Sequence, residues 1–536
     1  MLMSMKINNV ISLFAAGVDL KSTKQFETKN QKLHRLQEGI TFGDGDEYTP
    51  AEYLKMASET SLRYQESHYP RTMSNGMKTP EEIISLDSLE QDYWRMVEGY
   101  GRKTSVEYGN DIDTAKFWSG FPLSERGRAH NGTSKRSKAV AEPEFGTDEY
   151  YKETWWNLNN ISSCPGSVLR HVKCKITGIN IPWLYFGCLF STFCWHNEDN
   201  YLYSINYHHS GAPKQWYGVP GTREDADGLE HIFKSNLAAK MRDVPDLLHH
   251  ITTMFSPRLL QRAKVPVYKL TQHSGEFVVT FPRAFHGGFS FGPNIGEAVN
   301  FATPDWISHG SDANERYRSY ARTAVFSHDR LTFTLSHFMK EHTHESVTLL
   351  EKELERVIAE ELRLRTRLLE QGVRDISSQI TLPKNRLDQL DEDSADYDDK
   401  RLCFSCKHVC FFSAVACECS QSKVSCLRHS HFMCKCKTNR RYLMIWSSAK
   451  EMTKTLERVK ERRKILGKKV VQHIDLTKSS LTSIDKPLST ESAPGIDEDL
   501  MRHKSYNLEG DLSLKSFSRV NFPGNKPRLR LVLPKH

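Results

Sequence analysis

Eight of the chain's 12 cysteines fall between Cys403 and Cys436, and this cluster limits most strongly how the chain can fold. The metal-ligating residues of this stretch form four close pairs: Cys403/Cys406, Cys417/Cys419, Cys426/His429 and Cys434/Cys436. Two tetrahedral zinc sites need eight ligands, so the four pairs suffice and Cys410 is spare. A disulfide-bonded protein of this length would scatter its cysteines through its domains, so the cluster indicates metal in a reducing compartment.

The rest of the chain is long enough for further domains. A length of 536 residues is typical of two to four domains, and 38% hydrophobic content supports at least one sizeable core. The net charge of +8 comes from 74 basic and 66 acidic residues, so charged partners must be inferred from local patches. No run of about 18 apolar residues occurs, so we expect no membrane partner.

Short aromatic-rich segments follow one another from Trp155 to Trp306, separated by glycine and proline. Examples are "PWLYFGCLFSTF" (182–193) and "GEFVVTFP" (275–282). This spacing predicts an all-β barrel or double-sheet roll, with a helical insert around 224–260.

The flanking segments have other patterns. The run 48–69 predicts a helix, with Thr49 as its N-cap and Pro50 at its first position. Apolar residues at helical spacing in 344–371 predict a long amphipathic helix. We interpret the basic insert 124–141 as a loop and the acidic run 387–400 as a linker.

The stretch "FCWHNEDNYLYSINYHHSGAPKQW" (193–216) carries many ionisable groups within a strand-like pattern. His196 and Glu198 are two positions apart, so on a strand they point to the same face and can reach one ion. A second histidine, His286, follows the strand-like run "GEFVVTFPRAF". Two imidazoles and one carboxylate beside open positions suit Fe(II). The alternative is a pair of hydrogen-bonded polar residues at the mouth of a barrel.

Three segments together closely resemble the JmjC histone lysine demethylases, over roughly residues 86–320. They are "PWLYFGCLFSTFCWHNEDNYLYSINYHHSGAPKQWYGVPG", "VPVYKLTQHSGEFVVTFPRAFHGGF" and "GEAVNFATPDW". The resemblance implies a mainly β fold with α additions, built on a double-stranded β-helix, which is a cupin-like barrel. It also implies Fe(II), 2-oxoglutarate and O2, with hydroxylation of an N-methyl group and release of formaldehyde.

The resemblance assigns roles to individual residues. It makes His196, Glu198 and His286 the Fe(II) ligands. The residues that it places around 2-oxoglutarate are Tyr108, Phe193, Ser204, Asn206, Lys214 and Trp216. It places Tyr185 in the methylammonium pocket, where an aromatic face suits a soft cation. A tyrosine that only packs the barrel is the alternative for Tyr185.

The cysteine cluster resembles the finger of five cysteines, one histidine and two cysteines that follows the JmjC domain in several demethylases, plant enzymes among them. By that resemblance, Cys403, Cys406, Cys426 and His429 hold one zinc, and Cys417, Cys419, Cys434 and Cys436 hold the other. We therefore expect five regions: an N-terminal region without a clear JmjN segment (1–85), a JmjC catalytic domain (86–330), a helix and acidic linker (331–400), a double-zinc finger (401–450), and a basic helix with a disordered tail (451–536).

Two basic clusters, "KTNRRY" (437–442) and "KERRKILGKK" (460–469), could contact DNA phosphates or direct the chain to the nucleus. Solvated helix faces are the alternative. The family resemblance implies residence in the nucleus and the histone H3 tail in chromatin as partner.

An active demethylase is the function that this sequence favours. A non-enzymatic chromatin scaffold on a decayed barrel and a hydroxylase of an unmethylated side chain are the alternatives. Segments such as "TWWNLNNISSCPGSVLR" resemble a plant subgroup related to demethylases of lysine 9 or 27 of H3, so we expect one of these positions as substrate. The alternative is lysine 4, because "FSTFCWH" and the zinc module are similar to the lysine 4 enzymes.

Overall fold

The computed structural model describes residues 2–6, 20–69, 84–123, 144, 147–375, 401–420, 422–481 and 528–530. The insert at 124–141, the linker at 387–400 and most of the tail beyond 481 lie outside the described residues. Within the described part of the chain, no helix combines the length and apolar character needed to cross a membrane.

Two antiparallel sheets form the body of the molecule. The larger sheet has the order β16-β1-β10-β7-β12-β5-β4-β2-β3 and the smaller one the order β6-β11-β8-β9. The strands of the larger sheet are β16 (Arg528–Arg530), β1 (Leu2–Lys6), β10 (Glu276–Thr280), β7 (Tyr203–Gly211), β12 (Asn294–Phe301), β5 (Trp183–Gly187), β4 (Ser105–Asp113), β2 (Phe26–Lys32) and β3 (Gly43–Tyr48). Those of the smaller sheet are β6 (Thr192–His196), β11 (His286–Ser290), β8 (Lys214–Gly218) and β9 (Tyr268–Gln272). This is the double-sheet roll that the sequence predicts.

The N-terminal region packs directly on this roll. β2 pairs with β4, with Lys29 opposite Tyr108, and the Phe26 ring stacks on Phe186 at a centroid distance of 4.7 Å. The boundary expected at residue 85 therefore divides one packed body. The sequence pattern gives little sign of β2 because several of its side chains remain partly exposed.

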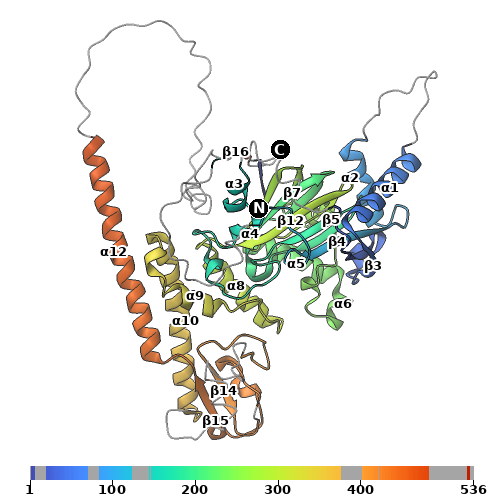
Figure 1. Cartoon of the computed structure of the whole chain (residues 1–536). Coiled ribbons are helices and arrows are strands. Elements are labelled where there is room, and N and C mark those ends of the chain that lie inside the picture. The colour runs from blue at the N-terminus through green and yellow to red at the C-terminus, as the bar shows by residue number, and fades with distance from the viewer. Residues whose placement is uncertain are drawn as a thin grey trace, which may run out of the picture.

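Helices cover the N-terminal side of the roll and fill the expected insert. α1 (Pro50–His68) begins with a capping box between Thr49 and Glu52, as its sequence predicts. α2 (Leu86–Val97) packs beside it (Figure 1). The insert around 224–260 contains α5 (Arg223–Asn236), α6 (Ala238–Asp243) and α7 (Pro257–Arg262).

The C-terminal part joins the roll through a helical layer. α8 (Trp306–Ser319) and α9 (His328–Leu335) follow the roll and both pack on α10 (His344–Glu370), which is the long helix that the sequence predicts. α12 (Ala449–Leu481) runs beside α10 (Figure 1). The cysteine-rich segment carries a small sheet, β13 (Arg374–Asp375), β15 (Arg441–Ile445) and β14 (Ser413–Cys417), at one end of α10.

Candidate functional site

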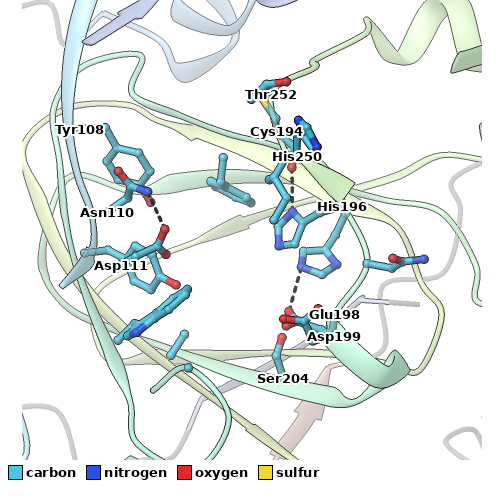
Figure 2. Close-up of a pocket in the computed structure, with 18 of the residues that line it drawn as sticks. Tyr108, Asn110, Asp111, Cys194, His196, Glu198, Asp199, Ser204, His250 and Thr252 are labelled. Atoms are coloured by element: carbon cyan, nitrogen blue, oxygen red, sulfur yellow. Dashed lines mark hydrogen bonds and ion pairs between the residues drawn. The ribbon is translucent and has the colours of Figure 1, made fainter. Parts of the chain in front are cut away.

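The three candidate iron ligands meet at the edge of the smaller sheet. His196 ends β6 and lies opposite His286, the first residue of β11. Glu198 follows two residues after His196, and its Oε1 lies 3.3 Å from His286 Nε2. One ligand atom from each of the three residues lies within 4.8 Å of the others. Figure 2 shows His196 and Glu198 facing the same pocket.

Backbone carbonyls fix the orientation of both histidine rings. His196 Nδ1 lies 2.7 Å from the carbonyl oxygen of Cys194, and His286 Nδ1 lies 3.1 Å from that of Ala284. A carbonyl oxygen can only accept, so each Nδ1 carries the proton and each Nε2 keeps a lone pair for a metal. This arrangement is typical of metal-binding histidines.

The charges of the ligands suit a divalent cation. Burial, aided by the nearby His286, lowers the pKa of His196 to about 4, so this imidazole is neutral at pH 7. Burial acts to raise the pKa of Glu198, but its contacts with His286 and the hydrogen bond from Asn300 outweigh it and hold this pKa at about 2. The triad therefore offers an ionised carboxylate beside imidazole nitrogens, which is the donor set that open Fe(II) sites use.

One pocket of about 510 Å³ holds the whole predicted site. The structure brings to its wall every residue that the sequence analysis assigns to iron, 2-oxoglutarate or the methyl group: Tyr108, Tyr185, Phe193, His196, Glu198, Ser204, Asn206, Lys214, Trp216 and His286. Of these, Ser204 also shares a 2.5 Å hydrogen bond with Thr280, so its hydroxyl is already engaged.

Lys214 is the buried cation of this pocket. It begins β8, is only 6% exposed, and forms no ion pair with a carboxylate of the described residues. Burial lowers the pKa of Lys214 to about 8. Its Nζ lies 5.6 Å from the centre of the Tyr185 ring, and a side chain at Gly296 would come within 3.0 Å of it. A buried ammonium group that lacks a protein counter-ion is a binding site for an anion.

The pocket also contains polar residues that the sequence analysis does not single out, and two of them lie near the predicted ligands. Asn300 donates a hydrogen bond of 3.0 Å to Oε2 of Glu198. Asp111 lines the pocket near Tyr185. Asn300 lies within the quoted segment "GEAVNFATPDW", so its position in a family motif was the available signal.

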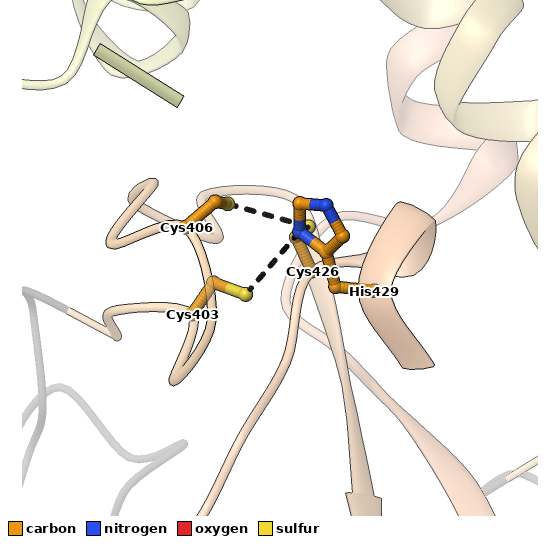
Figure 3. Close-up of side chains that lie close together, drawn as sticks. All are labelled: Cys403, Cys406, Cys426 and His429. Carbon is orange, nitrogen blue, oxygen red and sulfur yellow. Dashed lines mark hydrogen bonds between the residues drawn. The ribbon is translucent and has the colours of Figure 1, made fainter. Parts of the chain in front are cut away.

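The cysteine-rich segment forms two separate groups of four potential ligands. One contains Cys403, Cys406, Cys426 and His429, and the other Cys417, Cys419, Cys434 and Cys436; in each, the ligand atoms lie within 4.8 Å of one another. Figure 3 shows the first group, where His429 Nδ1 lies 3.3 Å from Cys426 Sγ. The pairs thus interleave as the family resemblance implies.

Neighbouring residues support this division. Cys410 belongs to neither group, and its buried thiol lies 3.8 Å from the carbonyl oxygen of His408. Arg441, in the first basic cluster, donates hydrogen bonds to the carbonyl oxygens of Cys434 and Cys436 at 2.7 and 3.3 Å. These contacts hold the loop that carries half of the second group.

The second basic cluster is also partly engaged within the fold. Lys460 and Arg463 on α12 pair with Glu355 and Glu351 on α10, at 2.7 and 2.6 Å. Arg462 donates to the carbonyl oxygen of Met339 at 3.0 Å. These charges hold α12 against the rest of the chain, so less of the cluster is free for DNA than its sequence suggests.

Comparisons with known proteins agree with this organisation. Residues 183–301 match the family described as "JmjC domain, hydroxylase", and residues 403–455 match the family described as "C5HC2 zinc finger". The chain is similar to lysine-specific demethylase 5D from Pan troglodytes and from Homo sapiens, with 38% identity over 391 residues in both cases. The aligned part is 73% of this chain and 24% of each relative, so the chain spans about a quarter of the length of these relatives.

The expectations on fold and cofactors are thereby confirmed. The two antiparallel sheets are those of a cupin-like JmjC domain. Such a hydroxylase domain uses Fe(II), 2-oxoglutarate and O2, and His196, Glu198 and His286 form its iron-type triad. The cysteine groups belong to a zinc finger.

Proposed function

We propose that this chain, which carries a JmjC hydroxylase domain followed by a C5HC2 zinc finger, is an Fe(II)- and 2-oxoglutarate-dependent histone lysine demethylase. One observation carries the proposal most directly: the metal triad and an unpaired buried lysine share one pocket. A decayed scaffold would have no need to keep a buried charge without a partner, because burying it costs stability.

In this proposal Lys214 binds the distal carboxylate of 2-oxoglutarate. The Tyr108 hydroxyl and the Asn206 amide add hydrogen bonds, and the rings of Phe193 and Trp216, with centroids 4.6 Å apart, form an apolar wall. A charge-assisted hydrogen bond contributes about 1.5–3 kcal/mol, so Lys214 supplies more of the binding energy of this distal carboxylate than either neutral hydrogen bond does.

The iron, when bound, supplies the oxidising chemistry that hydroxylates an N-methyl group. The protein's part is to hold and orient. His196, Glu198 and His286 would hold the metal, and the pocket that they line would receive 2-oxoglutarate. Tyr185 presents its ring to the methylammonium group. Hydroxylation of a methyl group needs no lone pair on nitrogen, so di- and trimethyl-lysine both fit this chemistry.

Lysine 4 of histone H3 is the substrate position that we favour. The sequence-based preference for lysine 9 or 27 finds no support in the relatives, which are lysine-specific demethylases 5D. The C5HC2 finger is matched, and it is one of the two features that resemble the lysine 4 enzymes. The partner would then be the H3 tail in chromatin, in the nucleus. Basic residues of α12 other than Lys460, Arg462 and Arg463, which form contacts within the fold, could lie near DNA.

Mass spectrometry of histone H3 peptides tests the activity and the position together. Peptides trimethylated at lysine 4, 9 or 27 are incubated with the full chain, Fe(II), ascorbate and 2-oxoglutarate. We expect loss of methyl groups from the lysine 4 peptide first, and none with His196→Ala. Turnover of only the lysine 9 or 27 peptide would overturn the position, and loss of methyl groups in no peptide would overturn the activity.

A further inference from the structure

β4 contains an irregularity next to the pocket. Gly109 lies opposite Phe186 and Ile112 lies opposite Leu184, so β4 has one residue more than β5 between these two pairs. Within this bulge Asp111 adopts a positive φ of 57°. Bulges beside active sites redirect side chains, and aspartate and asparagine tolerate this backbone conformation better than most other residues.

The bulge places the Asp111 carboxylate in the pocket beside Tyr185. Asn110 Nδ2 donates a hydrogen bond of 2.7 Å to Asp111 Oδ2, and the nearby Tyr185 hydroxyl stabilises the charged form of this carboxylate. Figure 2 shows Asn110 and Asp111 on the wall across from His196 and Glu198. No lysine or arginine of the described residues forms an ion pair with Asp111, although the residue is open to solvent through the pocket.

In the described part of the chain, no lysine or arginine neutralises Asp111, which lines the pocket that would receive a methylated lysine. Although the residue is open to solvent on one side, the pocket walls desolvate its carboxylate and raise the pKa of Asp111 to about 6, and Glu198 adds to this effect, so the carboxylate is still mostly ionised at pH 7.5. Glu198 itself would be a ligand of the metal. The rings of Tyr185 and Tyr108 stack with centroids 6.2 Å apart beside Asp111 and supply the apolar faces that a methylammonium group needs.

We propose that Asp111 is a specificity-determining residue that recognises the positive charge of the methylated lysine beside Tyr185. The inference rests on the proposed function. A quaternary ammonium has no N–H to donate, so a nearby carboxylate can favour it only through its charge, while the aromatic rings contact its methyl groups. Asp111 would thus make the pocket bind a methylated lysine more tightly than a neutral side chain of the same shape.

A neutral isostere of the substrate separates charge recognition from shape. Binding is measured to the full chain loaded with Mn(II) and N-oxalylglycine, which prevent turnover. The probes are the three H3 peptides trimethylated at lysine 4, 9 or 27, and the same peptides with carbon in place of the trimethylated nitrogen. We expect the chain to bind at least one charged peptide about tenfold more tightly than its isostere.

The variant Asp111→Asn should reduce this preference to less than about twofold and leave the affinity for the isostere unchanged. Asparagine tolerates the positive φ and keeps an acceptor oxygen in a side chain of the same shape, so only the charge is lost. Asp111→Gly, which also permits this backbone, should behave alike. The matched control is Asp44→Asn, which removes a carboxylate of the same pocket that Lys29 already neutralises at 2.9 Å.

The outcomes are distinct. If the wild type shows no preference for any charged peptide, or if Asp111→Asn keeps the preference, the inference is overturned. Equal loss of affinity for both probes would mean that Asp111 only positions Tyr185, and it would also overturn the inference. Demethylation is measured separately, so wild-type turnover together with an unchanged preference in Asp111→Asn would refute this inference and leave the proposed function standing.

Discussion

Asn300 holds the carboxylate of Glu198 in place. Its Nδ2 donates to Glu198 Oε2 at 3.0 Å and to the carbonyl oxygen of Tyr203 at 2.9 Å. The other oxygen of Glu198 is thereby turned toward His286 Nε2, 3.3 Å away. A strand residue that is not itself a candidate ligand thus fixes which oxygen of Glu198 would be presented to a metal.

We expect Asn300→Ala to lower the affinity for Fe(II) by about 10- to 100-fold, the usual effect of losing a residue that orients a metal ligand. Anaerobic titration of Fe(II) into the full chain measures it. The control is Asn294→Ala, which removes an amide from the same strand that bonds only the carbonyl oxygen of Gly292. Equal affinities in Asn300→Ala and the wild type would show that this hydrogen bond does not matter to the metal.

Binding of 2-oxoglutarate should weaken as the pH rises through about 8. Burial lowers the pKa of Lys214 to about 8, so in the free enzyme its charge is present below this pH and is lost above it. Because the cosubstrate binds the charged form, the dissociation constant should rise about tenfold for each pH unit above 8. Calorimetric titration between pH 6.5 and 9.5 measures this slope.

Removing the lysine should remove both the affinity and its pH dependence. In Lys214→Met we expect binding at pH 7 to weaken at least tenfold, from the loss of about 1.5–3 kcal/mol, and the slope above pH 8 to vanish. Lys214→Arg keeps a charge that does not titrate in this range. A pH slope that persists in Lys214→Met would assign it to another group.

Zinc content should distinguish Cys410 from Cys417. Cys410→Ala should leave two zinc ions per chain, because this thiol belongs to neither ligand group and hydrogen-bonds, among the described residues, to the carbonyl oxygen of His408. Cys417→Ser should lose one zinc and unfold the region around it, because a small domain with little core depends on its metal. Metal analysis of the purified full chain measures the zinc content of each variant. An equal loss of zinc in the two variants would show that Cys410 is a ligand.

Tyr317 on α8 supports the turn that follows Glu198. Its hydroxyl accepts a hydrogen bond of 2.8 Å from the amide of Asn200 and donates one of 3.1 Å to Asp199 Oδ1. Tyr317→Phe leaves this buried amide unsatisfied, so we expect a loss of about 1–3 kcal/mol in the free energy of unfolding, measured with urea. Tyr320→Phe, one turn further along, is the control, and a loss of equal size there would refute a specific role for Tyr317.

Much of the site follows from the sequence because its spacing is local. His196 and Glu198 are two residues apart, so on a strand their side chains point to the same face. Thr49 and Glu52 have the spacing of a capping box, which predicts the start of α1. The four ligand pairs at 403–436 could likewise be counted without a structure. Each of these patterns involves neighbours along the chain, for which the backbone geometry alone sets the relative position.

Asn300, Asp111 and the strands β2 and β3 could not be found in this way. The role of Asn300 depends on β12 lying next to β7. Strand β2 can be recognised only from its pairing with β4. The bulge at Asp111 arises from a mismatch between two paired strands, and a single strand carries no sign of its register.

The sequence by itself determined the kinds of chemistry that this protein can hold: an imidazole–carboxylate triad, a lysine for an anion and eight ligands for zinc. The tertiary structure brought the triad and Lys214 into one pocket and interleaved the ligand pairs into two groups, as the family resemblance implies, and it alone decided that Asp111 lines that pocket. The physical reason is that residue type and local spacing fix what a side chain can bind. Strand pairing and chain crossing bring distant segments together, and these depend on the packing of the whole core.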